Sequence, residues 1–271
     1  MTSTPAHAPI PKIIHCCWFG GNPMPEQLLA CMASWKIHCP DWEIIIWNET
    51  NFSIDAHIFT KTAYQHRKFA FVSDYVRAWA LHNVGGIYLD TDVELKLPLD
   101  SFCQHHGFSG FECVGYPFTA VWGSIAHHPL TTQILEYYQD REYAPEREQP
   151  NTGWISTLIT QQFGIDRTQD RHQTGWYQDY GFDVYPSTHF CLDLPLNYAT
   201  HHFHGSWMPE KFKTVSTKDI INSDHHRNMF LSYDHITSSS IKAAAQRLTW
   251  YHIFTIIRYK IKFSFKRLFS A

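Results

Sequence analysis

Residues 73–92 read SDYVRAWALHNVGGIYLDTD, and this stretch decides the fold. It predicts a helix that ends at two glycines, then a short apolar strand, then two aspartates separated by one residue. In an extended segment, residues i and i+2 point to the same side, so Asp90 and Asp92 converge while Thr91 faces away. Two adjacent carboxylates repel each other unless a cation lies between them, and hard divalent ions prefer oxygen ligands. The pattern therefore predicts a site for a metal ion that in turn holds phosphates.

An Asp-x-Asp pair also occurs by chance in solvated turns, so its surroundings decide its meaning. Asp74 and Arg77 lie three residues apart, on one face of the predicted helix. Because this helix leads directly into the acidic strand end, we expect the pair to line the same cleft. The alternative is a surface ion pair worth well under about 1 kcal/mol.

The rest of the chain alternates strands with helices, which favours a layered α/β domain. Strands are expected at 10–19, 42–47, 87–90, 108–111, 120–126 and 182–185. Helices are expected at 25–38, 66–83, 129–139 and 152–163, and a mobile loop at 166–181. In open sheets of this kind, ligands bind at the carboxyl ends of the strands, where Asp90 and Asp92 would lie.

Composition and cysteine content indicate a folded protein of a reducing compartment. The chain has 271 residues, of which 16% are aromatic, so disorder is not expected. Its 7 cysteines are an odd, scattered set without CxxC spacing, which argues against a disulfide framework or a zinc ribbon. The first eleven residues lack the apolar segment of a signal peptide, and no run reaches the roughly 18 apolar residues of a membrane span. A cytoplasmic location is therefore expected.

Charge is concentrated at the carboxyl end of the chain. Residues 241–271 contain 7 of the 22 Lys and Arg residues and no Asp or Glu, mixed with many aromatic and aliphatic side chains. This composition is typical of an amphipathic helix at an anionic membrane surface. The alternative is a terminal helix that packs on the domain with a solvated basic edge. The expected organisation is a flexible start at 1–9, a catalytic domain at 10–240 and this tail.

Four segments of the chain resemble one enzyme family, in the order that the family has. Ser-Asp-x-x-Arg followed by Gly-Gly-Ile-Tyr-Leu-Asp-x-Asp resembles the core of the family 32 glycosyltransferases, whose sugar-binding region contains a DXD motif. The family is related at this core to the clostridial glucosylating toxins. Residues 11–20 (PKIIHCCWFG) and 35–47 are similar to the family's first two strands, and residues 201–207 (HHFHGSW) to its closing segment. The resemblance implies a GT-A fold, the nucleotide-diphospho-sugar transferase type, with a mixed central sheet flanked by helices.

The resemblance also implies a set of site residues. Asp92 would ligate the metal, and Asp90 would contact the donor and join the metal shell. Related enzymes place a metal-binding histidine three residues before a glycine, which indicates His202, with His204 as the alternative. The catalytic set would be Asp90, Asp92, Asp74 and Arg77. The donor would be bound by His15, Trp18, Asp74, Arg77, Asp90, Ser206 and Trp207.

The function implied is metal-dependent, retaining glycosyl transfer. A hexose or N-acetylhexosamine would move from a nucleotide-sugar, with a UDP-sugar favoured, to a glycan or lipid-linked acceptor, with Mn²⁺ or Mg²⁺ as cofactor. Capsule or lipopolysaccharide synthesis at the inner face of a bacterial cytoplasmic membrane would be its setting, without a nucleic-acid partner. No residue is identified as a covalent nucleophile, which favours front-face attack within an ion pair. The alternatives are a toxin-like transferase acting on protein, and a non-catalytic sugar- or metal-binding protein.

Overall fold

The computed structural model describes residues 8–193 and 197–204, together with Trp250, Phe254, Ile257 and Arg258. The first two ranges belong to one compact unit, and the four remaining residues, all helical and exposed, belong to a second. Ser206, Trp207 and most of the 241–271 tail lie outside the described residues. Within the described part of the chain, no helix is long and apolar enough to cross a membrane.

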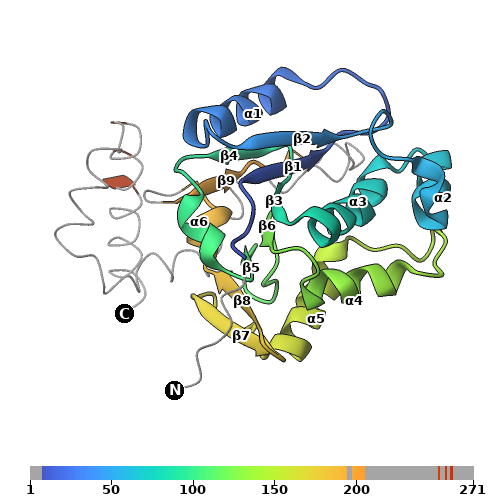
Figure 1. The fold of residues 1–271 in the computed structure, drawn as a ribbon. Coiled ribbons are helices and arrows are strands. Elements are labelled where there is room, and N and C mark those ends of the chain that lie inside the picture. The colour runs from blue at the N-terminus through green and yellow to red at the C-terminus, as the bar shows by residue number, and fades with distance from the viewer. Residues whose placement is uncertain (1–7, 194–196, 205–249, 251–253, 255–256, 259–271) are drawn as a thin grey trace, which may run out of the picture. The chain divides into compact units, whose positions relative to one another are not determined.

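The first unit is built on a seven-stranded mixed sheet with the order β2-β1-β3-β6-β5-β8-β7 (Figure 1). Its strands are β1 (Ile13–Cys17), β2 (Glu43–Trp47), β3 (Gly86–Leu89), β5 (Gly107–Gly110), β6 (Val121–Ser124), β7 (Gln173–Tyr177) and β8 (Tyr180–Tyr185). β1 is parallel to β2 and β3, β6 is antiparallel to β3 and β5, and β5 is parallel to β8. The carboxyl ends of β1, β2, β3, β5 and β8 therefore meet at one edge of the sheet.

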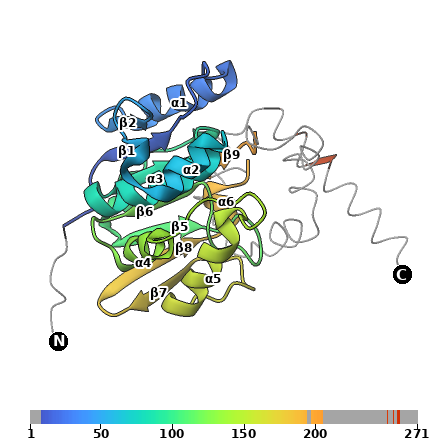
Figure 2. The ribbon, with the colours of Figure 1, turned by 90° about the vertical axis from the view of Figure 1, so that its right-hand side faces the viewer.

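Helices cover both faces of this sheet (Figure 2). They are α1 (Glu26–His38), α2 (Ile58–Gln65), α3 (Phe69–Val84), α4 (Pro129–Tyr138), α5 (Asn151–Phe163) and α6 (Ser187–Phe190), with 3₁₀ turns η1 (Ile54–Ala56) and η2 (Asp100–Gln104). A second, two-stranded sheet pairs β4 (Val93–Leu95) with β9 (Ala199–His201).

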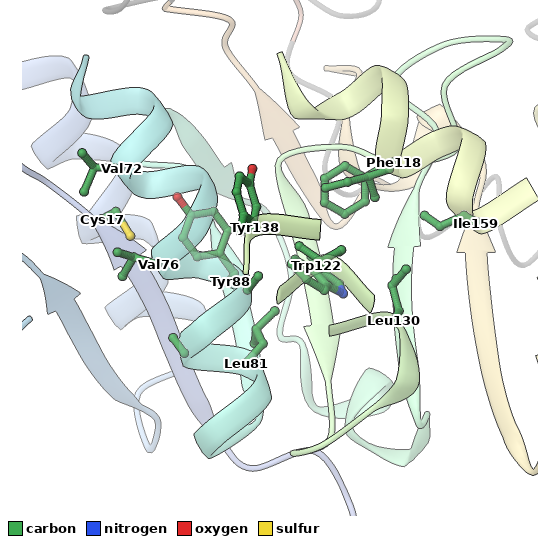
Figure 3. Packing of buried hydrophobic residues seen from close by; sticks show 14 of the residues in the cluster. Cys17, Val72, Val76, Leu81, Tyr88, Phe118, Trp122, Leu130, Tyr138 and Ile159 are labelled. Carbon is green, nitrogen blue, oxygen red and sulfur yellow. The ribbon is translucent and has the colours of Figure 1, made fainter. Parts of the chain in front are cut away.

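Each face of the sheet has its own hydrophobic core. On one face, residues of α2 to α5 pack around Tyr88 and Trp122. Figure 3 shows members of this core from α3, α4 and α5. On the other face, residues of α1, η2 and α6 pack around Ile87, Leu89 and Phe108. Successive residues of β3 thus point to opposite faces, and both faces are buried, so the strand needs apolar side chains throughout. This burial fixes the register in which β3 delivers the two aspartates to the sheet edge.

Two glycines join α3 to β3 in conformations that other residues rarely adopt. Gly85 (φ 72°) ends α3, and its N–H donates to the carbonyl of Leu81. Gly86 has φ 121°, and a Cβ there would lie 2.7 Å from the carbonyl oxygen of Ile13. Glycine is therefore required at position 86 both by its backbone angle and by the close approach of β1.

The predicted strands and helices are confirmed to within a few residues, with two kinds of exception. The loop expected at 166–181 is confirmed only for residues 166–172, because β7 and β8 form an antiparallel hairpin from Gln173 onward. Its turn contains Gln178 at φ 53° and no glycine, so the sequence carries no hairpin signal at this point. The sequence also gave no indication of α2, β4 or β9, and β4 and β9 are only three residues long.

Candidate active site

Asp90 and Asp92 lie just beyond β3, at the edge where the parallel strands end. The backbone N–H of Asp90 donates to the carbonyl of Ala120 at 3.0 Å, which continues the β3–β6 pairing past the strand. The Tyr88 hydroxyl donates to Oδ1 of Asp90 at 3.0 Å. The first aspartate is therefore fixed through both its backbone and its side chain.

The β4–β9 pair brings a distant histidine to the second aspartate. In this antiparallel ladder His201 lies opposite Val93, the residue that follows Asp92. Nε2 of His201 is 3.4 Å from Oδ1 of Asp92. The other carboxylate oxygen of Asp92 accepts a 2.8 Å hydrogen bond from the backbone N–H of His204. Strand pairing, and not closeness in sequence, thus completes the site.

Asp90, Asp92 and His201 form a group that fits a divalent cation. One ligand atom from each lies within 4.8 Å of the others. Nδ1 of His201 is buried and has no hydrogen-bond partner within the described residues. Two carboxylates with one imidazole suit Mn²⁺, and Mg²⁺ also accepts the carboxylate oxygens. We refer to these three residues as the cation group.

Asp92 and His201 stabilise each other's charged form. Burial opposes ionisation of Asp92, but the charge and hydrogen bond of His201 outweigh it and lower the pKa of this carboxyl. Burial likewise opposes protonation of His201, yet Asp92 raises the pKa of the imidazole well above its usual value. A divalent cation held by His201 would take the place of the imidazolium proton, so its binding would release a proton.

Asp74 and Arg77 of α3 lie buried beside Asp90. Nη2 of Arg77 is 2.5 Å from Oδ1 of Asp74, and Nη1 is 3.5 Å from Oδ1 of Asp90. The guanidinium also lies 4.9 Å from the centre of the Tyr88 ring. Burial raises the pKa of Asp74 to about 7, although the Arg77 charge opposes this. The pair is therefore not a surface ion pair, and it places a fixed positive charge at the edge of the cation group.

The structure does not bring His15 to the acidic pair. Its side chain is buried in the core, where Trp47 donates to Nδ1 at 3.1 Å and Nε2 lies 2.8 Å from the Gly85 carbonyl oxygen. Both ring nitrogens are thus occupied by structural hydrogen bonds. Trp18 lies in the segment after β1, and its indole N–H donates to the carbonyl of Asn22 at 2.7 Å.

The histidine expected to bind metal lies next to the one that joins the cation group. Nε2 of His202 is 2.9 Å from Oε2 of Glu94, which also pairs with Lys96 at 2.7 Å. His202 therefore faces Glu94, while the adjacent His201 faces Asp92. Nδ1 of His204, the alternative, is buried without a hydrogen-bond partner in the described chain. The sequence could not separate these neighbours, because only the β4–β9 register decides which one faces Asp92.

Comparison with known proteins gives a family match over the same region. Residues 25–109 match the family described as "Glycosyltransferase sugar-binding region containing DXD motif". This segment runs from just before α1 to β5, so it includes α3, β3 and both aspartates of the cation group.

Individual relatives agree with the family match over a limited length. Inositol phosphoceramide mannosyltransferase 1 of Schizosaccharomyces pombe is 30% identical over 139 residues, which are 46% of this chain and 42% of the relative. Inositol phosphoceramide mannosyltransferase 3 of the same organism is 29% identical over 132 residues, or 47% of this chain and 37% of the relative. The match thus spans about two fifths of the length of these relatives.

Among solved structures, the PaToxG glycosyltransferase aligns with a TM-score of 0.45 at 16% identity, over 56% of this chain and 69% of that one. The assignment rests on the sequence matches and not on this alignment. The sequence matches support a distant relationship of this chain to the glycosyltransferases whose sugar-binding region contains a DXD motif.

Proposed function

We propose that the protein transfers a hexose from a nucleotide-sugar to an acceptor hydroxyl, with a divalent cation held by Asp90, Asp92 and His201. The observation that carries this proposal is the cation group itself. Its ligand atoms lie within 4.8 Å of one another, at the sheet edge where open α/β sheets bind ligands. The family match over the same segment supports a sugar-nucleotide as the ligand.

The surrounding residues suit the departure of a diphosphate. A bound cation would act as a Lewis acid on the diphosphate and stabilise the charge of the leaving group. The buried Arg77 guanidinium adds a second positive charge next to Asp90, and Asp74 fixes its position through the 2.5 Å contact. The Tyr88 hydroxyl holds Asp90 in place. We expect retention of anomeric configuration, with front-face attack by the acceptor.

The names of the relatives suggest a donor and an acceptor class. Both S. pombe relatives are named as mannosyltransferases of inositol phosphoceramide. These names favour GDP-mannose among the candidate donors that the sequence leaves open, and a lipid headgroup that bears hydroxyls among the candidate acceptors. The choice between UDP-glucose, UDP-galactose, their N-acetyl counterparts and GDP-mannose is part of the test below.

A lipid acceptor is consistent with the composition of the 241–271 tail. Its 7 basic residues and its lack of acidic ones would attract an anionic lipid surface, and its aromatic residues would enter the interface. We propose that this segment holds the enzyme at a membrane where lipid-linked or lipid acceptors lie, as in the synthesis of a surface polysaccharide.

The proposal is tested by release of nucleoside diphosphate from a panel of nucleotide-sugars, measured with Mn²⁺, with Mg²⁺ and with EDTA. The wild-type protein is expected to hydrolyse one donor slowly without an acceptor, and EDTA or the substitution Asp92→Asn is expected to abolish this. The matched control is Asp193→Asn, an exposed aspartate outside the cation group. No release and no metal-dependent binding of any donor would contradict the proposal and favour a different ligand.

A further inference from the structure

Glu112 lies at the same sheet edge as the cation group. It is the second residue after β5, and β5 runs in the same direction as β3 because both are antiparallel to β6. Neighbouring strands lie roughly 4.8 Å apart, so the ends of β3 and β5 are separated by about 10 Å across β6. Glu112 and Asp90 therefore lie on either side of the start of β6, at the same edge of the sheet.

Two hydrogen bonds connect Glu112 to the cation group through Cys191. The thiol of Cys191 donates to the backbone carbonyl of Glu112 at 3.5 Å. The backbone N–H of His201 donates to the carbonyl of Cys191 at 3.0 Å. The N–H of Glu112 itself donates to the carbonyl of Tyr116, which closes the loop between β5 and β6. The position of Glu112 is thus tied to that of His201.

The carboxylate of Glu112 has no structural partner within the described residues. The residue is half-buried, and no hydrogen bond or ion pair from the described chain reaches its side chain. Burial raises the pKa of this carboxyl, His201 opposes the rise, and Asp90 and Asp92 add to it. The side chain therefore lies within electrostatic range of all three members of the cation group without belonging to it. With no hydrogen bond or ion pair from the described chain, this carboxylate is available to a ligand bound at the cation group.

We propose that Glu112 is a catalytic residue whose carboxylate contacts the donor sugar and stabilises the positive charge that develops at the anomeric carbon. This inference rests on the proposed function. If the cation group holds the diphosphate, the sugar attached to it lies beside the group, and Glu112 lies on the β5 side of the same edge. Carboxylates are the groups that stabilise oxocarbenium-like transition states in glycosyl chemistry.

The step balances without a further reactant. The bond between the anomeric carbon and the diphosphate oxygen breaks, and its electron pair leaves with the diphosphate. The acceptor oxygen forms the new bond to the anomeric carbon, and its proton passes to the leaving phosphate oxygen. Glu112 stays ionised and forms no covalent bond. Water takes the place of the acceptor when the donor is hydrolysed.

The test compares Glu112→Gln, Glu112→Gly and the control Glu142→Gln, an exposed residue on the loop after α4. For each, metal-dependent donor binding is measured by calorimetry and donor hydrolysis by diphosphate release. Glu112→Gln is expected to lower kcat by about 10²–10³-fold, the usual effect of removing one preorganised electrostatic group, and to leave the donor Kd within about threefold. Azide added to Glu112→Gly is expected to restore part of the rate and to yield a glycosyl azide, because the small anion enters the space left by the carboxylate.

Three results would overturn the inference. The first is a kcat of Glu112→Gln within about threefold of the wild type. The second is a fall in rate that is matched by loss of donor binding, which would make Glu112 a binding or structural residue. The third is the absence of any glycosyl azide. In all three cases the wild type still binds and hydrolyses a donor, so the proposed function stands. If the wild-type protein binds no donor, the proposed function is wrong, and this inference is wrong with it.

Discussion

His201 and His202 differ in what their imidazoles face, although they are neighbours in sequence. His201 lies 3.4 Å from Asp92, whereas His202 lies 2.9 Å from Glu94. We predict that His201→Gln raises the Mn²⁺ concentration needed for half-maximal donor hydrolysis by at least about 10-fold, since even outer partners of a metal site change affinity by that much. His202→Gln is expected to leave this concentration within about threefold. The measurement is diphosphate release against Mn²⁺ concentration, and the reverse order of the two variants would assign the ligand to His202.

His128, which lies outside the cation group, makes the free energy of unfolding depend on pH. His128 is buried at the start of α4, where Nδ1 accepts from the N–H of Leu130 at 3.2 Å and Nε2 lies 3.3 Å from the Gly181 carbonyl oxygen. Burial lowers the pKa of His128 to about 4, although the hydrogen bond to Gly181 opposes this. Between about pH 6.5 and pH 4 the unfolded chain binds a proton here that the folded protein does not, so stability falls as the pH drops.

The contribution of His128 amounts to about 2 kcal/mol lost between pH 7.5 and pH 5. The substitution His128→Asn keeps a side-chain acceptor at the helix N-cap and removes the titrating group. The free energy of unfolding in urea, measured at both pH values, should therefore fall less with acidification in the variant than in the wild type. An equal fall in the two proteins would show that His128 does not titrate as described.

At the scale of elements, the joint between α3 and β3 sets the geometry of the site. A Cβ at position 86 would meet the Ile13 carbonyl oxygen at 2.7 Å in a backbone conformation with φ 121°. Gly86→Ala is expected to destabilise the protein by about 2–4 kcal/mol, since strain and a backbone clash combine. Gly153→Ala in α5 is the matched control, because a Cβ there meets nothing within 4 Å.

Alanine at position 153 should stabilise the fold by about 0.4–1 kcal/mol, because it restricts the unfolded chain without strain in the helix. Urea unfolding of both variants is the measurement. If Gly86→Ala were as stable as the wild type, the close approach of β1 to the joint would not exist in solution.

The sequence predicts those site residues that lie close together along the chain. Asp74, Arg77, Asp90 and Asp92 fall within one helix–glycine–strand segment, so their spacing and the direct joint between helix and strand predict that they lie together. It could not place His201, because β4 and β9 are too short to show a period and their register is a tertiary property. The location of Glu112 could not be predicted from the sequence either. Only the strand order β3-β6-β5 shows that it lies at the same sheet edge as the two aspartates.

On the scale of the whole molecule, the 241–271 tail makes a testable prediction about membranes. The full chain is expected to bind vesicles that contain phosphatidylserine, and not vesicles of phosphatidylcholine alone, with binding that weakens as salt is added. Each basic residue near an anionic surface contributes about 1 kcal/mol, so reversing Lys260, Lys262 and Lys266 to Glu should weaken binding by about 100-fold or more. Sedimentation with vesicles measures this. Equal binding of the wild type and the variant to the vesicles would contradict a membrane-anchoring role of the 241–271 tail.

The central claim is that Asp90, Asp92 and His201 form one divalent-cation site that binds the donor. Its most direct measurement is titration of Mn²⁺ by electron paramagnetic resonance, with and without the nucleotide-sugar that the protein hydrolyses. We predict one Mn²⁺ bound per chain, tighter binding when the donor is present, and loss of this site in Asp92→Asn and His201→Gln but not in His202→Gln. Mn²⁺ binding that is the same in all four proteins, or that does not respond to the donor, would contradict it.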